Sequence, residues 1–544
     1  MKSLAISLGH NSSAVLIEDG RVVAGYEEER FTEVKSDSVF PANAIMHLNL
    51  RFGLDKHTDV YVGHWFTDAR LPTQSNKYWN YDAIKTWFPY GEIHSLSKDI
   101  THHDSHLLSA TVFAGPEFTQ DCIAVVADGF GSFGECLTVY HVRNGAHRIL
   151  HRVFGFEKSM GLLYQYATAF MGMKMHNHEY KMLAYEVHID EVLSGYEVSQ
   201  LDDMVHEAAG RYLKSMRQGT LSNEFDPLVD LSALPNVQNH INVALLGVLR
   251  TLGMAFDKTD ERSKRIVISY FVQRVVEQVI MATVGLYRPH NLLVAGGLFY
   301  NVKLNHKLAD SISGKFCAMP LAGDQGAALG VYEAYNGDLE WPDTLCWGPR
   351  DLSTLMFDLP RGAYAVSPSS AADRIADVLR NKGWVNIVRG NMEYGPRALC
   401  HTSTLALPTE ENVEIINRAN DRTVEMPFAP VMTAAQAEDH FEDTQKIHKS
   451  LEYMIMARAY KDGKVEKVKG AAHWYPDTNQ YTGRPQVTND PLMVTLLNEF
   501  GPLVNTSFNF HGVPIVRDVH QVLKTHNKQV ETAPDLNPTT LIIN

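Results

Sequence analysis

Two histidines four residues apart are the first candidates for chemistry in this sequence. His102 and His106 lie in the stretch THHDSHLLSA, residues 101–110. If that stretch is helical, the two imidazoles project from one face, one turn apart, and can bind the same divalent cation. His103 would then point elsewhere. The alternative is a polar helix start in a chain with 25 histidines, so a metal site requires further ligands.

Two aspartates in small-residue loops could supply those ligands. Asp128 opens the loop DGFGSFG after an apolar run, and Asp324 lies in AGDQGAALG at the head of a predicted helix. Aspartate in a turn commonly serves the turn itself. Beside a histidine pair, two carboxylates would complete a mixed nitrogen and oxygen ligand set.

A strand–loop–strand–turn–strand pattern that must position these residues occurs twice. Each copy offers a loop of small residues whose backbone N–H groups could approach a phosphate, although an ordinary hairpin turn is the alternative for either loop alone. The repetition indicates an internal duplication. The predicted strands are 3–8, 14–17 and 22–27 in the first copy, and 122–127, 137–142 and 148–153 in the second.

The region from about 155 to 329 is mainly helical in pattern. Within it, NLLVAGGLFYN at 291–301 predicts a buried strand that ends at Gly296 and Gly297 and leads into a helix. Glycines at such a junction commonly let a nucleotide lie against the backbone.

Length and composition predict a folded, soluble, intracellular protein of more than one domain. The chain has 544 residues, 45% hydrophobic and 21% charged, and a formal charge of −14 that disfavours broad nucleic-acid or anionic-membrane binding. Its five scattered cysteines fit a reducing compartment. The most apolar helical stretch, 265–287, is interrupted by charges and predicts a buried or amphipathic helix. We therefore expect a cytoplasmic location and no membrane partner.

A second domain is predicted after residues 337–370, which lose periodicity and collect prolines and glycines. A helix at 371–382 and a strand at 385–388 follow. This region contains guanidiniums suited to phosphate or carboxylate, although surface salt bridges are the alternative for any one of them. It also contains three short polar side chains that alternate and would share one face of an extended segment. The guanidiniums are Arg397, Arg422 and Arg484, and the polar side chains are Asn505, Ser507 and Asn509.

Several motifs together resemble the O-carbamoyltransferases of the NodU/CmcH type (TobZ-like). The match runs from about residue 4 to about 518. The motifs are Gly9-His10, EERF at 28–31 with Lys35, the His102/His106 pair, DGFG at 128–131, AGG at 295–297 with Asn301, GDQG at 323–326, MEYGPRAL at 392–399, PFAPVM at 427–432, GRPQV at 483–487, NTSFN at 505–509 and GVPIV at 512–516.

The resemblance implies an α/β chain: a duplicated actin-like domain at 1–350, then an α+β YrdC-like domain at 365–544. It implies that His102, His106, Asp128 and Asp324 bind one metal, iron(II) in the best match. It places Gly129, Gly131, Gly296, Gly297 and Asn301 at a nucleotide, and His10 and Lys35 as catalytic residues near the phosphate and the carbamoyl group. Arg397, Arg422, Arg484, Asn505, Ser507 and Asn509 would bind carbamoyl phosphate and ATP, which Mg²⁺ could accompany.

The implied activity is the ATP-dependent formation of carbamoyl-adenylate and transfer of its carbamoyl group to a hydroxyl. A sugar or natural-product hydroxyl is the family default, and a hydroxymethylated base in DNA is the second choice. Aromatic residues between 64 and 90 could stack on either acceptor, although local packing is the commoner role of aromatic residues in a loop. A homodimer is left open. The rival classes are a tRNA threonylcarbamoyl-type enzyme and a non-catalytic nucleotide-binding protein.

The chain departs from the family pattern mainly in the second domain. Asn420, Thr423 and Met426 stand where arginine and lysine are common, and Thr402 stands where many members have arginine. In the first domain, Asn11 replaces an aspartate after His10. These changes leave donor binding and the acceptor open.

Overall fold

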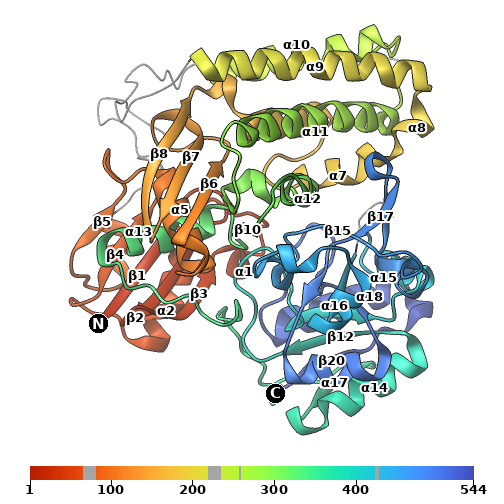
Figure 1. The fold of residues 1–544 in the computed structure, drawn as a ribbon. Helices are drawn as coiled ribbons and strands as arrows, with labels where there is room; N and C mark the ends of the chain where they lie inside the picture. Colours follow the sequence, from red (N-terminus) through yellow and green to blue (C-terminus); the bar gives the residue numbers. More distant parts are fainter. Residues whose placement is uncertain (65–80, 219–233, 257–258, 423–427) are drawn as a thin grey trace. The chain divides into compact units, whose positions relative to one another are not determined.

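The computed structural model describes residues 1–64, 81–218, 234–256, 259–422 and 428–544 (Figure 1). The chain divides into two compact units. Unit 1 consists of Met1–Tyr61, Asn80–Ile93 and Asp338–Asn544, and unit 2 of Val62–Trp79 and His94–Gly337. Unit 1 is therefore discontinuous in sequence. This division reflects packing, and the functional boundaries at 1–350 and 365–544 stay a prediction.

Two five-stranded sheets have the same strand order. The orders are β3-β2-β1-β4-β5 and β8-β7-β6-β9-β10, and in each the first three strands of the chain segment are antiparallel neighbours. This repetition confirms the duplicated α/β architecture. The strands are β1 (Lys2–Ser7), β2 (Ser13–Glu18), β3 (Arg21–Glu27), β4 (Asp59–Gly63), β5 (Ile93–Ser95), β6 (Asp121–Ala127), β7 (Glu135–Arg143), β8 (Ala146–Phe154), β9 (Leu292–Ala295) and β10 (Phe316–Ala318).

The predicted tight turns occupy equivalent places in the two copies. Asp19-Gly20 joins β2 to β3, and Asn144-Gly145 joins β7 to β8. All four residues have positive φ, at 49°, 79°, 50° and 78°. Two central residues with positive φ are typical of the type I′ hairpin, whose twist matches that of the flanking strands.

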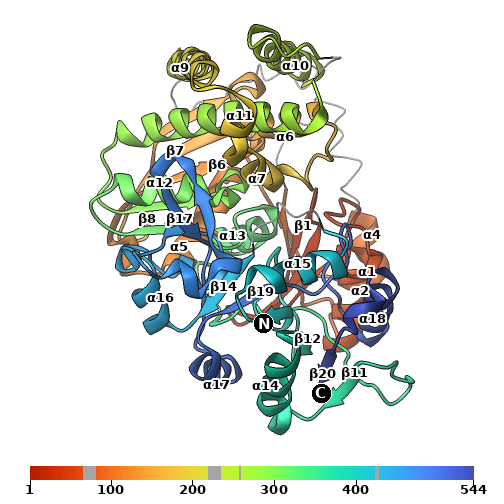
Figure 2. The ribbon, with the colours of Figure 1, turned by 90° about the vertical axis from the view of Figure 1, so that its right-hand side faces the viewer.

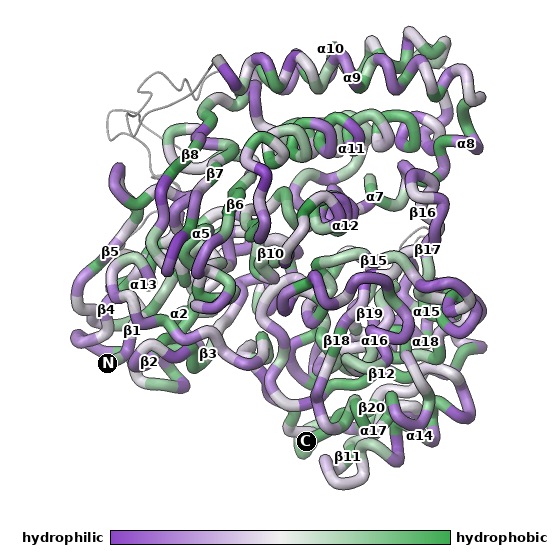
Figure 3. Tube along the Cα trace, in the orientation of Figure 1, coloured by the Kyte–Doolittle hydropathy of each residue, from purple (hydrophilic) through white to green (hydrophobic). Residues whose placement is uncertain are grey.

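Helices make up most of the rest of unit 2. α11 is apolar and long enough to span a membrane by length and composition, but 83% of its most apolar window is buried. Figures 2 and 3 show this largely apolar helix lying beneath α9 and α10, which identifies it as a core helix. The helices are α5 (His102–Ala114), α6 (Met160–Phe170), α7 (Met182–Tyr185), α8 (Ile189–Val192), α9 (Gly195–Gln218), α10 (Leu234–Thr251), α11 (Glu261–Gly285), α12 (Val302–Ser311) and α13 (Asp324–Asn336).

The later part of unit 1 is an α+β arrangement around a mixed seven-stranded sheet of order β11-β20-β12-β13-β19-β14-β18. A small sheet, β15-β17-β16, accompanies it. The strands are β11 (Ala363–Val366), β12 (Trp384–Arg389), β13 (Thr402–Ala406), β14 (Ala429–Met432), β15 (Arg458–Ala459), β16 (His473–Tyr475), β17 (Gln480–Gly483), β18 (Gln486–Val487), β19 (Leu503–Ser507) and β20 (Thr540–Ile543).

The helices of unit 1 close its hydrophobic core. Leu379 of α14 and Leu497 of α17 pack with Val385 and Leu405 of the sheet, and all four are fully buried. The predicted helix at 371–382 matches α14, and the predicted strand at 385–388 lies within β12. The helices are α1 (Glu29–Thr32), α2 (Ala42–Phe52), α4 (Tyr81–Trp87), α14 (Ala371–Lys382), α15 (Glu410–Ala419), α16 (Ala434–His440), α17 (Pro491–Phe500) and α18 (Val519–Thr532).

Candidate metal centre and anion site

The four predicted metal ligands converge in unit 2. One potential ligand atom from each of His102, His106, Asp128 and Asp324 lies within 4.8 Å of the others, and all four residues are buried. The two Nε2 atoms are 3.1 Å apart. Nε2 of His102 lies 3.3 Å from Asp324 Oδ1, and Nε2 of His106 lies 3.4 Å from Asp128 Oδ2. Two imidazoles and two carboxylates form a donor set that zinc or iron(II) can use.

Local sequence fixes the histidines at the start of α5. Thr101 is the N-cap of this helix and forms a capping box with Asp104, which satisfies backbone donors at both positions. The histidine pair therefore occupies the first helical turns and shares one face, as the spacing predicts. Asp128 directly follows β6, and Asp324 is the first residue of α13.

A close approach between α5 and α13 brings the histidines to Asp324. Gly330 of α13 faces the backbone of Ser105, and a Cβ at position 330 would stand only 1.8 Å from the Ser105 carbonyl oxygen. No side chain fits between the helices at this point. The contact between α5 and α13 thus depends on a glycine.

Strong electrostatic coupling links the four residues. Burial alone would lower the pKa of His102, but hydrogen bonds to Asp128 and Asp324 and their charges raise it to about 10. The same carboxylates outweigh burial and raise the pKa of His106. Burial opposes ionisation of Asp128, yet the two histidines lower its pKa. The carboxylates therefore favour the protonated form of the histidines, with which a bound cation would compete.

A buried polar network behind α5 was not predicted from the sequence. Glu135 of β7 accepts hydrogen bonds from the backbone N–H of His103 (2.9 Å) and the hydroxyl of Thr101 (3.1 Å). Arg152 of β8 donates to Asp104 at 2.6 Å. The ring of His103 contacts the hydroxyl of Thr138 on β7, so it points away from the ligand cluster, as expected. The network fixes the first turn of the helix that carries His102.

The predicted nucleotide-binding glycines lie around Asp128. The N–H of Gly129 donates to Asp128 Oδ1 at 2.6 Å, and a Cβ at Gly297 would lie 3.0 Å from the same oxygen. A Cβ at Gly131 would lie 2.9 Å from the Cβ of His102, and one at Gly296 would lie 2.3 Å from the carbonyl oxygen of Ala127. These glycines thus border the ligand cluster. Their contact with a nucleotide stays a prediction.

The side chain of Asn301 makes hydrogen bonds to other residues of the chain through both its oxygen and its nitrogen. It is the N-cap of α12, where its Oδ1 accepts from the Leu304 N–H at 3.0 Å. Its Nδ2 donates to Gln273 at 2.8 Å. This pairing has no local signal in the sequence, and a nucleotide would have to compete with it.

The remaining predicted site residues belong to unit 1. His10 follows β1, and Lys35 follows α1; both are half-buried. Burial and the positive charges of Arg422 and Arg397 lower the pKa of Lys35, although Glu29 opposes them. The structure thus brings Lys35 into one electrostatic cluster with two predicted donor-binding arginines.

Arg484 is the third predicted arginine of this cluster. Burial, followed by the charges of Arg397 and Arg422, holds its pKa well below the usual arginine range. Its Nε has no hydrogen-bond partner in the described part of the chain. Arg422 donates to the hydroxyl of Thr506 at 2.6 Å. Half-buried cations that repel one another form a site that an anion would stabilise. We call Lys35, Arg397, Arg422 and Arg484 the cation cluster.

The three polar residues near the end of β19 differ in part from expectation. The Asn505 amide donates to the Ala398 carbonyl at 3.0 Å, which ties β19 to the loop after Arg397. Because β19 ends at Ser507, Asn509 does not share its strand face. Ser507 instead donates to Asn509 at 2.5 Å, and Asn509 donates to the Val513 carbonyl at 2.7 Å. The residues stay close together through hydrogen bonds, not through strand alternation.

Thr402 and Asn420, two of the residues that depart from the family pattern, make hydrogen bonds within unit 1. Thr402 accepts a hydrogen bond from Arg350. Asn420 is buried, accepts from Gln529 at 2.8 Å and donates to the Ile416 carbonyl at 3.2 Å. Thr423 and Met426 lie outside the described residues, as does most of the aromatic segment between 64 and 90.

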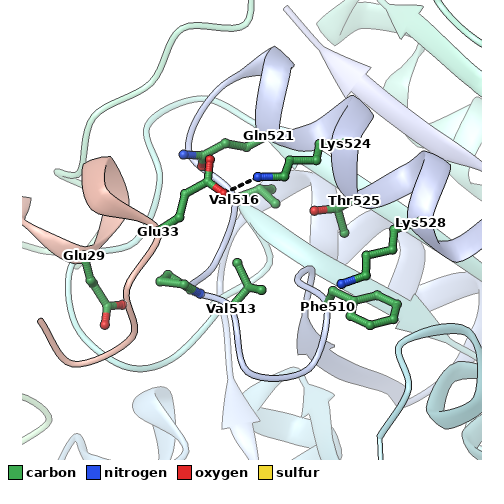
Figure 4. Close-up of a pocket in the computed structure, with 10 residues that line it drawn as sticks. Glu29, Glu33, Phe510, Val513, Val516, Gln521, Lys524, Thr525 and Lys528 are labelled. Carbon is green, nitrogen blue, oxygen red and sulfur yellow. Dashed lines mark hydrogen bonds and ion pairs between the residues drawn. The ribbon is translucent and has the colours of Figure 1, made fainter.

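A pocket with an apolar floor and charged walls also lies in unit 1. Its floor is formed by Phe510, Val513 and Val516, and its walls include Glu29 and Lys524 (Figure 4). Lys524 forms an ion pair with Glu33, drawn as a dashed line in Figure 4. The pocket is bordered by the segment that leads to Lys35 and by the loop that follows Asn509.

Two family models match the chain. The model described as the carbamoyltransferase N-terminus matches residues 92–332, and the one described as the carbamoyltransferase C-terminus matches residues 376–534. The metal-ligand cluster falls in the first match, and Arg397, Arg422 and Arg484 fall in the second.

Curated relatives agree with these models. An uncharacterized protein of Methanocaldococcus jannaschii is 25% identical, with 94% of each chain covered. Nodulation protein NolNO of Sinorhizobium fredii is 26% identical, covering 95% of this chain and 76% of the relative. A 3'-hydroxymethylcephem-O-carbamoyltransferase of Amycolatopsis lactamdurans is 29% identical, covering 41% of this chain and 43% of its own. Among solved structures, full-length HypF matches 63% of this chain and 56% of its own, with 14% identity and a TM-score of only 0.29.

Proposed function

The chain belongs to the carbamoyltransferase family and is a carbamoyltransferase enzyme, and on that premise we propose that it transfers the carbamoyl group of carbamoyl phosphate to a hydroxyl at the expense of ATP. The observation that carries this proposal is the cation cluster of unit 1. Cations that are half-buried and held together against their repulsion suit a substrate with several anionic oxygens. Carbamoyl phosphate and ATP both have that character.

The cation cluster is assigned to activation of the donor. Hydrolysis of carbamoyl phosphate would give carbamate and inorganic phosphate, and a carbamate oxygen would attack the α-phosphorus of ATP to form carbamoyl-adenylate and release pyrophosphate. Arg397, Arg422 and Arg484 would bind the phosphoryl oxygens, and Lys35 would add a point charge. Asn505, Ser507 and Asn509 would hydrogen-bond the carbamoyl group.

The four-residue cluster of unit 2 is assigned to transfer. His102, His106, Asp128 and Asp324 would hold a divalent metal, iron(II) by the family resemblance, and their buried nitrogen and oxygen donors fit such an ion. When bound, the ion would supply Lewis-acid polarisation of the transferred group. Gly129, Gly131, Gly296 and Gly297 would let the nucleotide approach the backbone. His10 is proposed to accept the proton of the attacking hydroxyl.

The acceptor is proposed to be a hydroxyl of a sugar or natural product. One of the curated relatives is named for a 3'-hydroxymethylcephem acceptor, and a primary hydroxyl of that kind supports the choice. A hydroxymethylated base in DNA is the second candidate. The formal charge of −14 disfavours extensive phosphate-backbone contact, so a DNA substrate would need a local basic groove.

ATP–pyrophosphate exchange tests the proposed activation. Purified protein should exchange labelled pyrophosphate into ATP only when carbamoyl phosphate is present. Nucleotide binding without exchange would contradict the proposal and favour a non-catalytic nucleotide-binding protein. Exchange supported by threonine and bicarbonate in place of carbamoyl phosphate would favour a tRNA-modifying enzyme.

A second experiment identifies the acceptor class. Labelled carbamoyl phosphate and ATP are incubated with a panel of sugars, hydroxylated natural products and hydroxymethylated DNA, and the label is followed into a carbamate ester. Matched acceptors that lack the hydroxyl serve as controls. Labelling of the DNA alone would replace the small-molecule acceptor.

A further inference from the structure

Arg30 lies at the centre of a buried network in unit 1. It belongs to the short helix α1, and its side chain is only 2% exposed. Its Nη2 contacts Glu27 Oε2 at 2.6 Å, and its Nη1 contacts Glu29 Oε1 at 2.9 Å. A buried guanidinium between two carboxylates is held in one orientation, because each hydrogen bond restricts the planar group.

One side of the network grips the loop that carries Arg397. Arg30 Nη2 donates to the Gly395 carbonyl at 2.8 Å, and Glu27 accepts from the Gly395 N–H at 3.1 Å. Both backbone polar groups of Gly395 are thus bound by one ion pair. Gly395 has φ of 102°, which favours glycine, so the loop turns sharply at this point. Arg397 follows two residues later, and its direction depends on that turn.

The opposite side of the network holds the segment that carries Lys35. The second oxygen of Glu29, Oε2, accepts from the backbone N–H of Ser36 at 2.7 Å. Lys35 is therefore adjacent to a backbone group fixed through Glu29 to Arg30. The carbonyl of Arg30 itself accepts from Gln521 of α18 at 3.1 Å, which anchors the network to the rest of the unit.

We propose that Arg30 is a positioning residue for the cation cluster, because a single guanidinium orders the backbone next to Lys35 and the backbone next to Arg397. The inference rests on the proposed donor site. Arg30 is buried and its charge is matched by Glu27 and Glu29, so we assign it no contact with substrate. Arg30 therefore affects anion binding by fixing the positions of Lys35 and Arg397.

A charge-preserving substitution separates positioning from charge. Arg30→Lys keeps one positive charge but cannot contact Glu27, Glu29 and Gly395 together, since an ammonium lacks the planar fork. Glu27→Asp also keeps the charge and withdraws the carboxylate from Gly395. Losing a charge-assisted hydrogen bond that orders the site should weaken anion binding by about 10- to 100-fold.

The test compares the affinity for inorganic phosphate, by titration calorimetry, with the KM for carbamoyl phosphate in pyrophosphate exchange. The Kd for phosphate and the KM for carbamoyl phosphate should both rise in Arg30→Lys and Glu27→Asp, while urea unfolding reports the folded fraction. Arg21→Lys is the matched control. Arg21 also joins the N-terminal segment to the later chain, through an ion pair of 2.8 Å with Glu340, but at an exposed position. Its Kd and KM should equal those of the wild type.

The outcomes separate this inference from the proposed reaction. A folded Arg30→Lys or Glu27→Asp protein with unchanged phosphate Kd would overturn the positioning role. A lower kcat with unchanged KM and Kd would indicate only a loss of active protein and would also overturn it. Wild-type protein that binds phosphate more tightly than Arg30→Lys but catalyses no exchange would contradict the reaction and support the positioning role.

Discussion

At the scale of single residues, we expect each member of the histidine–aspartate cluster to be required for metal binding. His106→Ala or Asp324→Ala removes one of four converging ligands and should abolish metal binding and carbamoyl transfer, because the remaining donors cannot complete the coordination. Pyrophosphate exchange should persist, since the cation cluster is unaltered. Metal content by mass spectrometry and the two assays check this. His103→Asn is the adjacent control and should keep the metal stoichiometry; undiminished transfer in both alanine variants would refute the assignment.

The titration of Lys35 gives a second residue-scale prediction. Only its ammonium form attracts an anion, and burial with Arg422 and Arg397 nearby lowers its pKa. Phosphate affinity should therefore fall with rising pH before an ordinary lysine would deprotonate, and binding in that pH range should take up protons. Calorimetry in buffers of different ionisation enthalpy measures the uptake. Lys35→Arg stays charged and should lose this pH dependence; an unchanged profile in that variant would assign the effect to another group.

The site residues that could be predicted from the sequence are those that belong to a local sequence pattern. The His102/His106 pair follows from helical periodicity, and Asp128 and Asp324 follow from their loops. Glu135 and Arg152 could not be found, because they reach α5 from strands distant in sequence and only the strand register places them there. The expected shared face of Asn505, Ser507 and Asn509 was wrong in part because the end of β19 could not be located from local pattern.

At the scale of elements, the approach of α5 to α13 positions the metal ligands. Gly330→Ala would place a methyl group 1.8 Å from the Ser105 carbonyl, so the helices must separate. We expect a loss of about 1–3 kcal/mol of unfolding free energy from this overpacking, together with weaker metal binding. Urea unfolding and metal titration measure the two effects.

A glycine elsewhere in unit 2 provides the control for Gly330. Gly210 lies within α9 and would meet nothing within 4 Å on gaining a Cβ. Gly210→Ala should therefore stabilise the protein by roughly 0.5–1 kcal/mol through helix propensity and leave the metal unaffected. Equal effects of the two substitutions would show that the helix contact is not the cause.

The elements themselves were largely predictable. The two hairpins, α14 and β12 follow from apolar runs and turn residues, whose signals are local. The hydrogen bond that joins α11 to Asn301 could not be predicted in this way, because the Gln273 amide meets Asn301 across 28 positions of sequence. Pairing of that kind depends on tertiary packing.

At the scale of the whole molecule, unit 1 joins the first strands to the last third of the chain. A fragment of residues 365–544 contains six strands of the seven-stranded sheet, part of β11, and Arg397, Arg422 and Arg484, but it lacks Lys35 and the Arg30 network. We expect this fragment, even when soluble and folded by circular dichroism, to show no exchange dependent on carbamoyl phosphate. Exchange at the full-length rate would show that the N-terminal segment is dispensable for activation.

The discontinuity of unit 1 also affects how the nascent polypeptide matures. Residues 1–61 are synthesised well before residues 338–544, which supply most of their partners within unit 1. At roughly 5–20 residues per second, synthesis of the intervening chain takes on the order of tens of seconds. Through that interval Arg30 lacks Gly395, and Tyr394 has not yet reached Ser13, with which it makes a 2.7 Å hydrogen bond. The N-terminal segment therefore makes these contacts only after most of the chain has been translated.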